Sequence, residues 1–106
     1  MQYIMRYALK DGVASDFRDW VQKNGQEMGD HAADGWSYLG TYFTVMGFGT
    51  FEVETRWEVE NYSTFEAGFG DDTFQRLFGE WNDFINPNLP GETYLMKSAG
   101  DVAIME

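Results

Sequence analysis

The chain has 106 residues, a common size for one domain, and 18% of these residues are aromatic. This much bulky apolar surface excludes a disordered chain and is sufficient for one core. Eighteen acidic against seven basic residues give a formal net charge of −11. Because that charge repels phosphate backbones and anionic lipid surfaces, neither nucleic acid nor a membrane is expected as a partner.

The sequence contains no cysteine, which excludes disulfides, thiolate metal sites and a cysteine nucleophile. No apolar run approaches the roughly 18 to 20 residues that a membrane span needs. The first ten residues alternate in polarity, whereas a signal peptide has an apolar block. We therefore expect a cytoplasmic protein with a single domain over residues 1–106.

The first half of the chain predicts a strand, a helix and a hairpin of two strands. Residues 2–9 alternate with the period of a strand. After a turn at 10–12, apolar residues at helical spacing predict an amphipathic helix. Gly25 and Gly29 are expected to interrupt its end, which is predicted between Asn24 and Asp30. Residues 36–45 and 51–59 are rich in aromatic and β-branched residues and predict strands joined by a loop at 47–50. An even-numbered loop would pair Met46 with Phe51, Thr44 with Val53, Tyr42 with Thr55 and Gly40 with Trp57. These side chains are then expected to face the helices, and Phe43 to lie on the other face of the sheet.

The second half predicts two helices and a last strand. Asn61 is placed to cap a short helix that runs through Phe65 and Phe69. Asp71 and Asp72 are both interpreted as helix caps, and Asp72 and Gln75 have the spacing of a capping box. An apolar stripe then predicts a helix that ends at Asn86. The last strand is predicted over 93–98. The tail, 100–106, is expected to add an edge strand or to contact a partner chain.

This order of elements predicts an α+β fold of ferredoxin-like βαββαβ type, with a four-stranded antiparallel sheet and the helices on one face. The third strand should lie between the first and second, and the fourth at the far edge. The sheet face without helices then carries aromatic, aliphatic and charged residues together. A surface of this kind needs a cover, and a second copy of the chain is the simplest one.

The segments YIMRYALKDG, GWSYLGTYFTVMGFG and FEVETRWEV, with a helix after the first, resemble the dimeric α/β-barrel superfamily and its NIPSNAP-like members. The similarity spans residues 2–99 and lies in element order and general pattern. It implies two ferredoxin-like domains that pack sheet to sheet, with cavities between sheet and helices or inside the barrel. Members of the superfamily include cofactor-free oxygenases, haem-degrading proteins, isomerases and decarboxylases. No catalytic residue carries over, because no motif matches.

His31 is the only histidine. It is the candidate for a catalytic residue as a general base, or for an axial haem ligand, if its loop borders a cavity. The alternative, which we favour because no motif accompanies it, is an exposed loop histidine. Glu52, Glu54 and Glu58 share one strand face with Arg56, so ion pairing is favoured over a metal site. No metal site and no cofactor is expected.

Arg6 and Arg56 are predicted to lie close to Glu54 on the sheet face without helices. A structural role in charge pairing is the first interpretation. The functional interpretation is that one arginine takes the carboxylate of an otherwise apolar ligand. The residues expected to line such a ligand site come from all four strands: Arg6, Arg56, Phe43, Tyr42, Trp57, Tyr94 and Met96.

Three hypotheses of function follow. The first is a homodimer that holds a small, mostly apolar molecule, such as a fatty-acid-like carboxylate, in a sheet-helix or barrel cavity. The second is a cofactor-free oxygenase or isomerase that uses His31, Tyr94 or an arginine. The third is a structural or interaction module without a ligand, whose sheet face serves only to dimerise.

Overall fold

Four antiparallel strands form one sheet in the order β2-β3-β1-β4. The computed structural model describes residues 1–47, 51–67 and 70–101. The strands are β1 (Gln2–Tyr7), β2 (Trp36–Phe43), β3 (Val53–Val59) and β4 (Glu92–Met96), and the α-helices are α1 (Ala14–Asp30), α2 (Tyr62–Glu66) and α3 (Asp72–Asn82). A 3-10 turn, η1 (Ala99–Asp101), follows β4. The ferredoxin-like fold class and the predicted strand order are both confirmed.

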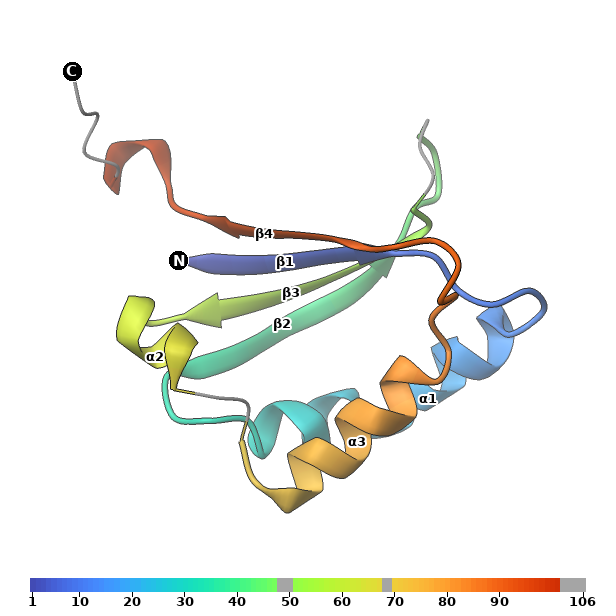
Figure 1. Ribbon diagram of the computed structural model, residues 1–106, viewed down its shortest axis with the longest axis horizontal. Helices are drawn as coiled ribbons and strands as arrows, with labels where there is room; N and C mark the ends of the chain where they lie inside the picture. The colour runs from blue at the N-terminus through green and yellow to red at the C-terminus, as the bar shows by residue number, and fades with distance from the viewer. Residues whose placement is uncertain (48–50, 68–69, 102–106) are drawn as a thin grey trace.

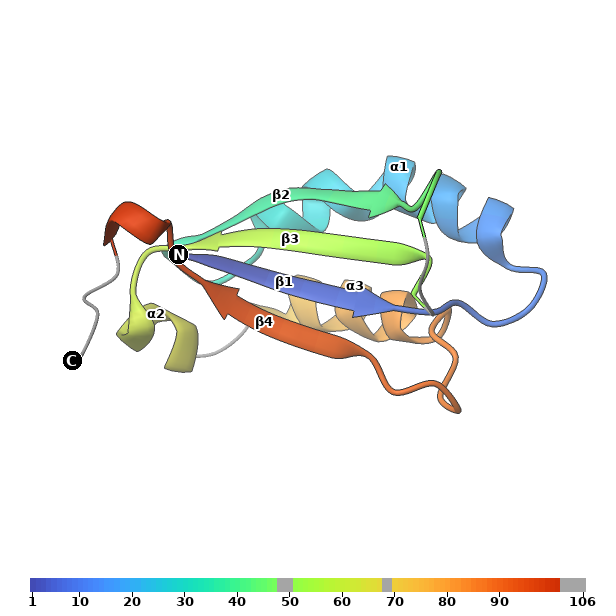
Figure 2. The ribbon, with the colours of Figure 1, turned by 90° about the horizontal axis from the view of Figure 1, so that it is seen from above.

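Helices α1 and α3 lie side by side against one face of the sheet, and the short α2 lies at one end of it (Figure 1). Seen from the side of the sheet away from these helices, the four strands lie in front of α1 and α3, and no described element crosses over the strands (Figure 2). We call this second side the open face. Its residues that concern the site below are Ile4, Arg6, Tyr42, Glu54, Arg56, Glu92, Tyr94 and Met96.

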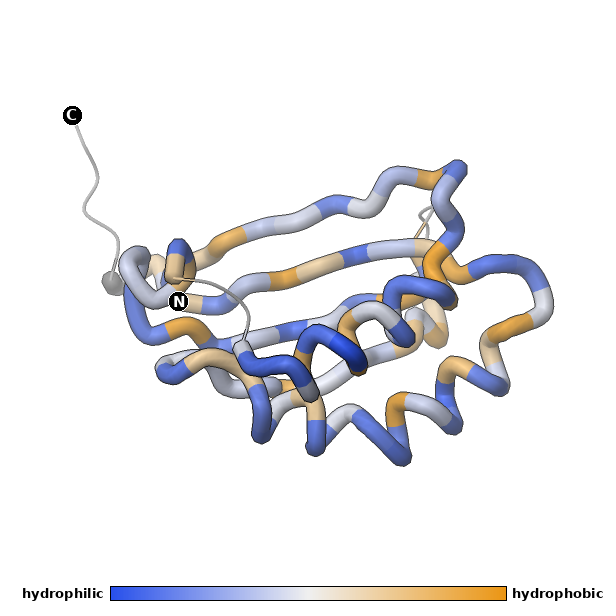
Figure 3. Tube along the Cα trace, turned by 60° about the horizontal axis from the view of Figure 1, so that its bottom comes forward, coloured by the Kyte–Doolittle hydropathy of each residue, from blue (hydrophilic) through white to orange (hydrophobic). Residues whose placement is uncertain are grey.

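The core lies between the sheet and the two long helices. Hydrophobic and hydrophilic residues alternate along the strands and repeat at helical spacing along α1 and α3 (Figure 3), so each element turns one apolar side inward. The most deeply buried side chains there are Phe17 of α1, Leu77 of α3, and Val53 and Val59 of β3. Burial of an aliphatic or aromatic side chain contributes about 1.5–3 kcal/mol each, so this layer holds the sheet to the helices.

The register between β2 and β3 differs from the prediction by one residue. Tyr42 lies opposite Glu54 and Gly40 opposite Arg56, with an irregularity between Tyr38 and Gly40. Gly40 has φ +141°, a conformation that favours glycine, so this is where the strand accommodates an extra residue. A slip of one residue exchanges the two faces of a strand. Tyr42 therefore lies on the open face, and Phe43, predicted there, packs against Phe17 of α1.

Helix α1 ends at Asp30, within the predicted limits. Gly25 and Gly29, expected to interrupt the end of the helix, instead form part of it. A Cβ atom on Gly29 would lie 2.7 Å from Cβ of Tyr38, so the missing side chain is what lets α1 approach β2 closely. The glycines are thus packing positions rather than helix terminators.

Helix α3 differs from the prediction at both ends. Its cap is Asp71, whose carboxylate accepts a hydrogen bond from the Phe74 amide at 3.0 Å, so the expected capping box at Asp72 is wrong by one residue. The helix ends at Asn82 rather than Asn86. The residues after it leave the helix because their backbone bonds to the segment after β1: Ile85 bridges to Leu9, and the Lys10 amide donates to the Phe84 carbonyl.

The remaining elements keep their predicted places with shorter bounds. The first strand ends at Tyr7 and the last at Met96. Asn61 caps α2 as predicted, since its side chain accepts a hydrogen bond from the Thr64 amide at 2.9 Å. Phe69, predicted for this helix, part of the 47–50 loop, and most of the 100–106 tail lie outside the described residues.

Candidate functional site

Two neighbouring rows of side chains cross the open face. Strand register aligns Tyr42, Glu54, Arg6 and Glu92 in one row, and Gly40, Arg56, Ile4 and Tyr94 in the next. Each strand contributes one member to each row, because side chains two residues apart point to the same side of a strand. Residues from both ends of the sequence are thereby brought together at the centre of the sheet.

Glu54 binds both arginines of the open face. Nε of Arg6 donates to Oε1 of Glu54 at 2.8 Å, and Nε of Arg56 donates to Oε2 at 2.6 Å. Burial acts to raise the pKa of Glu54, but the hydrogen bonds from the two arginines outweigh it and lower that pKa. The predicted ion cluster therefore forms, with a carboxylate that stays ionised between two cations.

Tyrosine rings flank the cluster on both sides. The guanidinium carbon of Arg6 lies 5.1 Å from the ring centre of Tyr94, and that of Arg56 lies 5.3 Å from the ring centre of Tyr42. Both distances are within the range of cation–π attraction. The hydroxyl of Tyr94 in turn donates to the Glu92 carboxylate, and this bond raises the pKa of Tyr94. The rings thus help to orient the two guanidinium groups.

A groove of about 490 Å³ lies beside the cluster on the open face. Its size falls in the range of about 300–1,000 Å³ that is common for ligand sites. Met96 is about half exposed there, whereas Ile4 is buried between Arg56 and Tyr94 in its row. The groove combines cationic, polar and apolar residues: Met1, Gln2, Ile4, Arg6, Arg56, Glu58, Met96, Lys97 and Ser98.

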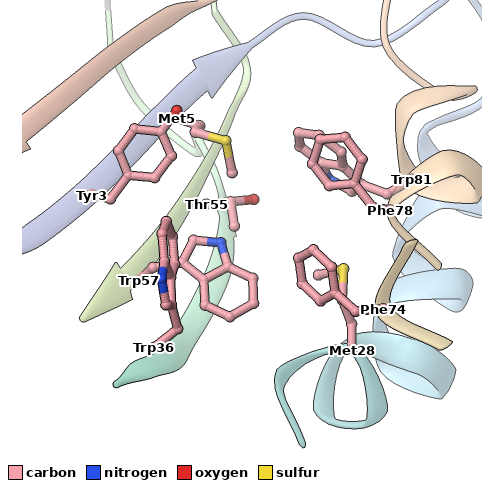
Figure 4. Close-up of a pocket in the computed structure, with 9 residues that line it drawn as sticks. All are labelled: Tyr3, Met5, Met28, Trp36, Thr55, Trp57, Phe74, Phe78 and Trp81. Carbon is pink, nitrogen blue, oxygen red and sulfur yellow. The ribbon is translucent and has the colours of Figure 1, made fainter. Parts of the chain in front are cut away.

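A second hollow lies in the core, between sheet and helices, with a volume of about 80 Å³. Sheet residues face helix residues across it (Figure 4). An apolar cavity of about 150 Å³ accepts benzene, so this one is too small for more than a few atoms. Apart from the Thr55 hydroxyl its walls are almost entirely aromatic side chains and methionines: Tyr3, Met5, Met28, Trp36, Thr55, Trp57, Phe74, Phe78 and Trp81.

A chain of hydroxyl groups runs through the same layer. The hydroxyls of Tyr7 and Thr55 are hydrogen bonded at 2.6 Å, those of Thr55 and Thr41 at 3.0 Å, and those of Thr41 and Tyr38 at 2.6 Å. The indole N–H of Trp81 donates to the Tyr7 hydroxyl at 3.0 Å. Burial raises the pKa of Tyr7 and of Tyr38 above the ordinary value for tyrosine, so both hydroxyls stay neutral and keep these hydrogen bonds at physiological pH.

Five of the seven predicted ligand-site residues share the open face: Arg6, Arg56, Tyr42, Tyr94 and Met96. The other two do not. Trp57 is buried on the helix side, where its ring packs against Trp36 and Phe74, and Phe43 is on the same side against Phe17. Ligand binding by the five residues of the open face remains a prediction. Trp57 and Phe43 lie on the other side of the sheet and do not share a site with these five.

His31 is the residue after α1, and its side chain is 40% exposed. Its Nδ1 lies 2.7 Å from Oδ2 of Asp71, and this hydrogen bond raises the pKa of His31 and lowers that of Asp71. His31 is among the lining residues of neither hollow described above. Its position agrees with an exposed loop histidine, and a role of His31 as a general base stays a prediction.

The sequence reasoning missed several site residues, among them Lys97 and Thr55. Lys97 was predicted within the last strand but not assigned to the ligand site, although it lines the groove beyond the end of β4. Thr55 lies in the middle of a strictly alternating strand and is buried. This alternation could have identified it, because a hydroxyl on the inward face of a strand needs hydrogen-bond partners. Among the described residues, no group of three His, Asp or Glu side chains could hold a metal ion.

The structure is similar to crystal structures of NIPSNAP proteins. An uncharacterised NIPSNAP domain protein from Burkholderia xenovorans is 19% identical, with a TM-score of 0.64, over 93% of this chain and 96% of that one. A nipsnap family protein with unknown function from Agrobacterium tumefaciens is 20% identical, with a TM-score of 0.66, over 98% and 92%. A conserved protein from Methanosarcina mazei is 15% identical, with a TM-score of 0.60, over 91% of each chain.

No protein-family model matches the sequence, and no curated protein matches it either. At identities of about one fifth, structural similarity establishes the fold and nothing beyond it. The chain therefore has the NIPSNAP-like, ferredoxin-like fold that the sequence resemblance implied. Within the described residues, no helix is both long and apolar enough to cross a membrane.

Proposed function

We propose that this protein is a homodimer that binds a small, mostly apolar molecule on the open face of its sheet. The observation that carries the proposal is the groove of about 490 Å³ next to Arg6 and Arg56. Its apolar contribution comes from Met96, Ile4 and Met1, and its polar contribution from the two arginines together with Gln2, Glu58, Lys97 and Ser98. The apolar side chains offer contact to an apolar chain, and the polar groups can fix the orientation of a ligand.

The groove is favoured over the cavity between sheet and helices. The cavity, at about 80 Å³, is several times smaller, and its walls belong to the buried core. Expanding it would separate packed aromatic rings such as Trp57 and Phe74, whose centres lie 5.9 Å apart. Close-packed interiors resist such expansion, whereas the groove needs no rearrangement of the core.

A second copy of the chain is the cover proposed for the open face. Large apolar side chains there are substantially exposed, among them Tyr42 at 49% and Met96 at 51%. Exposed large apolar side chains on one sheet face favour an interaction there, and a two-fold dimer covers the same face on both chains. In such a dimer the groove would be enclosed between two sheets.

Methionine methyl groups report on the two hollows separately. Met96 and Met1 line the groove, Met5 and Met28 line the cavity, and Met46 is 95% exposed in the β2–β3 loop. With ¹³C-methyl-methionine protein, titration with octanoate is expected to shift the NMR signals of Met96 and Met1 saturably. Single Met→Leu variants assign the signals, and Met46 serves as the control for nonspecific contact.

The same titration identifies the alternatives. Shifts at Met5 and Met28 without shifts at Met96 would place the ligand in the core cavity and contradict the proposed site. If neither octanoate nor the neutral 1-octanol moves any methionine signal, the protein does not bind small apolar molecules of this kind. Equal, unsaturable shifts at Met46 and Met96 would show surface adsorption only.

A further inference from the structure

We propose that the groove takes a monocarboxylic acid with an apolar chain, and that Arg6 and Arg56 together bind its carboxylate. This inference rests on the proposed function, because it concerns the same groove, and it adds the chemical class of the ligand. It requires that the two arginines have donors to spare, that they lie side by side, and that the local charge suits one negative charge.

The donors to spare are the Nη groups. Arg6 and Arg56 each donate to Glu54 through Nε alone. Arg6 has a further hydrogen bond to the Tyr94 side chain, whereas within the described residues Arg56 makes no hydrogen bond through Nη. Arg18, an ordinary surface arginine, instead directs both Nε and Nη2 to Asp19. A guanidinium group that served pairing alone would be expected to use its fork in the same way. On the open face the Nη groups of Arg56 stay available, and Arg6 shares its donors with Tyr94 only.

The two guanidinium groups are neighbours because their Nε atoms bond to the two oxygens of one carboxylate, that of Glu54. Their side chains are 45% and 44% exposed, whereas Glu54 beneath them is 18% exposed. The rings of Tyr94 and Tyr42 lie against them from outside the pair. Held in this way, the arginines lose little conformational freedom when they bind an anion.

The local charge matches a monoanion. Arg6, Arg56 and Glu54 together carry one net positive charge, and three of the seven basic side chains of a chain with net charge −11 line this groove. Glu58 lines it as well, and Glu92 lies opposite Arg6 across the strands. These two carboxylates oppose a dianion such as a phosphate monoester more strongly than a carboxylate.

The apolar part of the ligand has a defined direction. From Arg56 the groove continues past Ile4 to Met96, which lies opposite Gln2 in the next row along the strands. Lys97, also in the groove, has its ammonium 5.0 Å from the ring centre of Tyr62. Lys97 therefore already contacts Tyr62 of α2. Its positive charge adds to the electrostatic potential at that end of the groove, but Lys97 is not needed to bind the carboxylate.

Three octyl compounds test the headgroup in the methionine NMR titration, with Met96 as the reporter. Octanoate is expected to bind about tenfold more tightly than 1-octanol, the advantage of charge-assisted hydrogen bonds at a partly exposed site. Octyl phosphate is expected to bind no more tightly than octanoate. Tighter binding of octyl phosphate would overturn the assignment to a monocarboxylate.

Arginine variants connect that preference to the two residues. Arg6→Gln and Arg56→Gln should each weaken octanoate binding several-fold while leaving 1-octanol binding within about twofold, because only the charged headgroup loses partners. Arg76→Gln is the matched control, since Arg76 lies on α3 and pairs with Glu80. Thermal melting by circular dichroism checks that all three variants fold. Unchanged octanoate binding in both groove variants contradicts the inference.

Failure of the inference is distinguishable from failure of the proposed function. If octanoate and 1-octanol bind equally well at Met96, the groove binds apolar molecules and the role of the arginines is refuted. If neither binds, the proposed function itself fails. A loss of octanoate binding in Arg76→Gln would show a general effect of net charge and would also overturn the specific role of Arg6 and Arg56.

Discussion

His31 joins the end of one helix to the beginning of another. Its ring bonds to Asp71, the same carboxylate caps α3 through the Phe74 amide, and the Asp71 amide donates to the His31 carbonyl. The sequence predicted His31 in a loop and a cap at Asp71 or Asp72, but not their contact. Helix caps follow local rules, whereas a contact over 40 residues depends on how α1 and α3 pack.

The His31–Asp71 bond predicts a pH dependence that one NMR signal can follow. The pKa of His31 is raised in the folded chain. The stability that His31 contributes is therefore fully present below its unfolded-state pKa of 6.5 and is lost as the pH rises through its folded-state pKa. The pKa of Asp71 is lowered, so its part is present above its unfolded value and is lost as the pH falls through the folded pKa. The pair stabilises most between about pH 4 and about pH 6.5.

Because the chain has a single histidine, the titration of its ring protons is unambiguous. The midpoint is expected above 6.5 in the unmodified chain and closer to 6.5 in Asp71→Asn, which removes the charge and keeps a good helix cap. An identical midpoint in the two proteins would refute the effect of Asp71 on His31.

Arg6, Glu54 and Arg56 show what a sequence can specify at this scale. Their proximity was predictable because strand alternation assigns each to a face and the strand order makes β1 and β3 neighbours. Which donors the arginines use was not predictable. It depends on the position of the Tyr42 and Tyr94 rings, and the face of Tyr42 in turn depends on the irregularity in β2.

At the scale of elements, periodicity located every α-helix and strand in the described part of the chain but not the 3-10 turn η1, and the other errors lie in ends and register. The pairs from Gly40 to Phe43 are displaced by one residue from the prediction, and the irregularity between Tyr38 and Gly40 displaces the pairs before it by one more. The early end of α3 arises because its last predicted turn bonds to residues 8–10 instead. Strand pairing and long-range bonds of this kind do not follow from a regular local pattern.

Two glycines at helical positions predict opposite effects of the same substitution. Gly29→Ala should destabilise the protein by about 1–3 kcal/mol, because the new Cβ would lie 2.7 Å from Cβ of Tyr38 and force α1 away from β2. Gly79→Ala should stabilise it by about 1 kcal/mol, since nothing lies within 4 Å of the new atom and alanine favours a helix. Urea unfolding of both variants measures the difference.

If Gly29→Ala is as stable as the unmodified chain, α1 does not depend on this close approach to β2. Gly79→Ala then remains the internal reference, because it reports the helix propensity of alanine without any change in packing. A destabilised Gly79→Ala would contradict the open surroundings of that position.

At the scale of the whole molecule, the fold divides the chain into a packed side and an unpacked one. Helices α1 and α3 cover one face of the sheet (Figure 2). On the other face the described chain leaves Tyr42, Tyr94 and Met96 exposed. The sequence predicted this division, since its two strand faces differ in composition. It did not separate the ligand residues by face, because Trp57 and Phe43 were assigned to the same site as the arginines.

The proposed dimer follows from that division, and its interface should be sensitive to charge on the open face only. Tyr42→Glu places a carboxylate on the exposed apolar surface of the open face, where it is expected to repel the second copy. Leu89→Glu is the matched control. Leu89 is similarly exposed, at 39%, but it belongs to the connection before β4 rather than to the open face.

Size-exclusion chromatography with light scattering tests the central claim most directly. The unmodified chain and Leu89→Glu should have twice the chain mass of 12.2 kDa, and Tyr42→Glu should shift toward a single chain mass. A monomeric unmodified chain would contradict the claim that a second copy covers the open face. A dimer unaffected by Tyr42→Glu would place the interface elsewhere on the molecule.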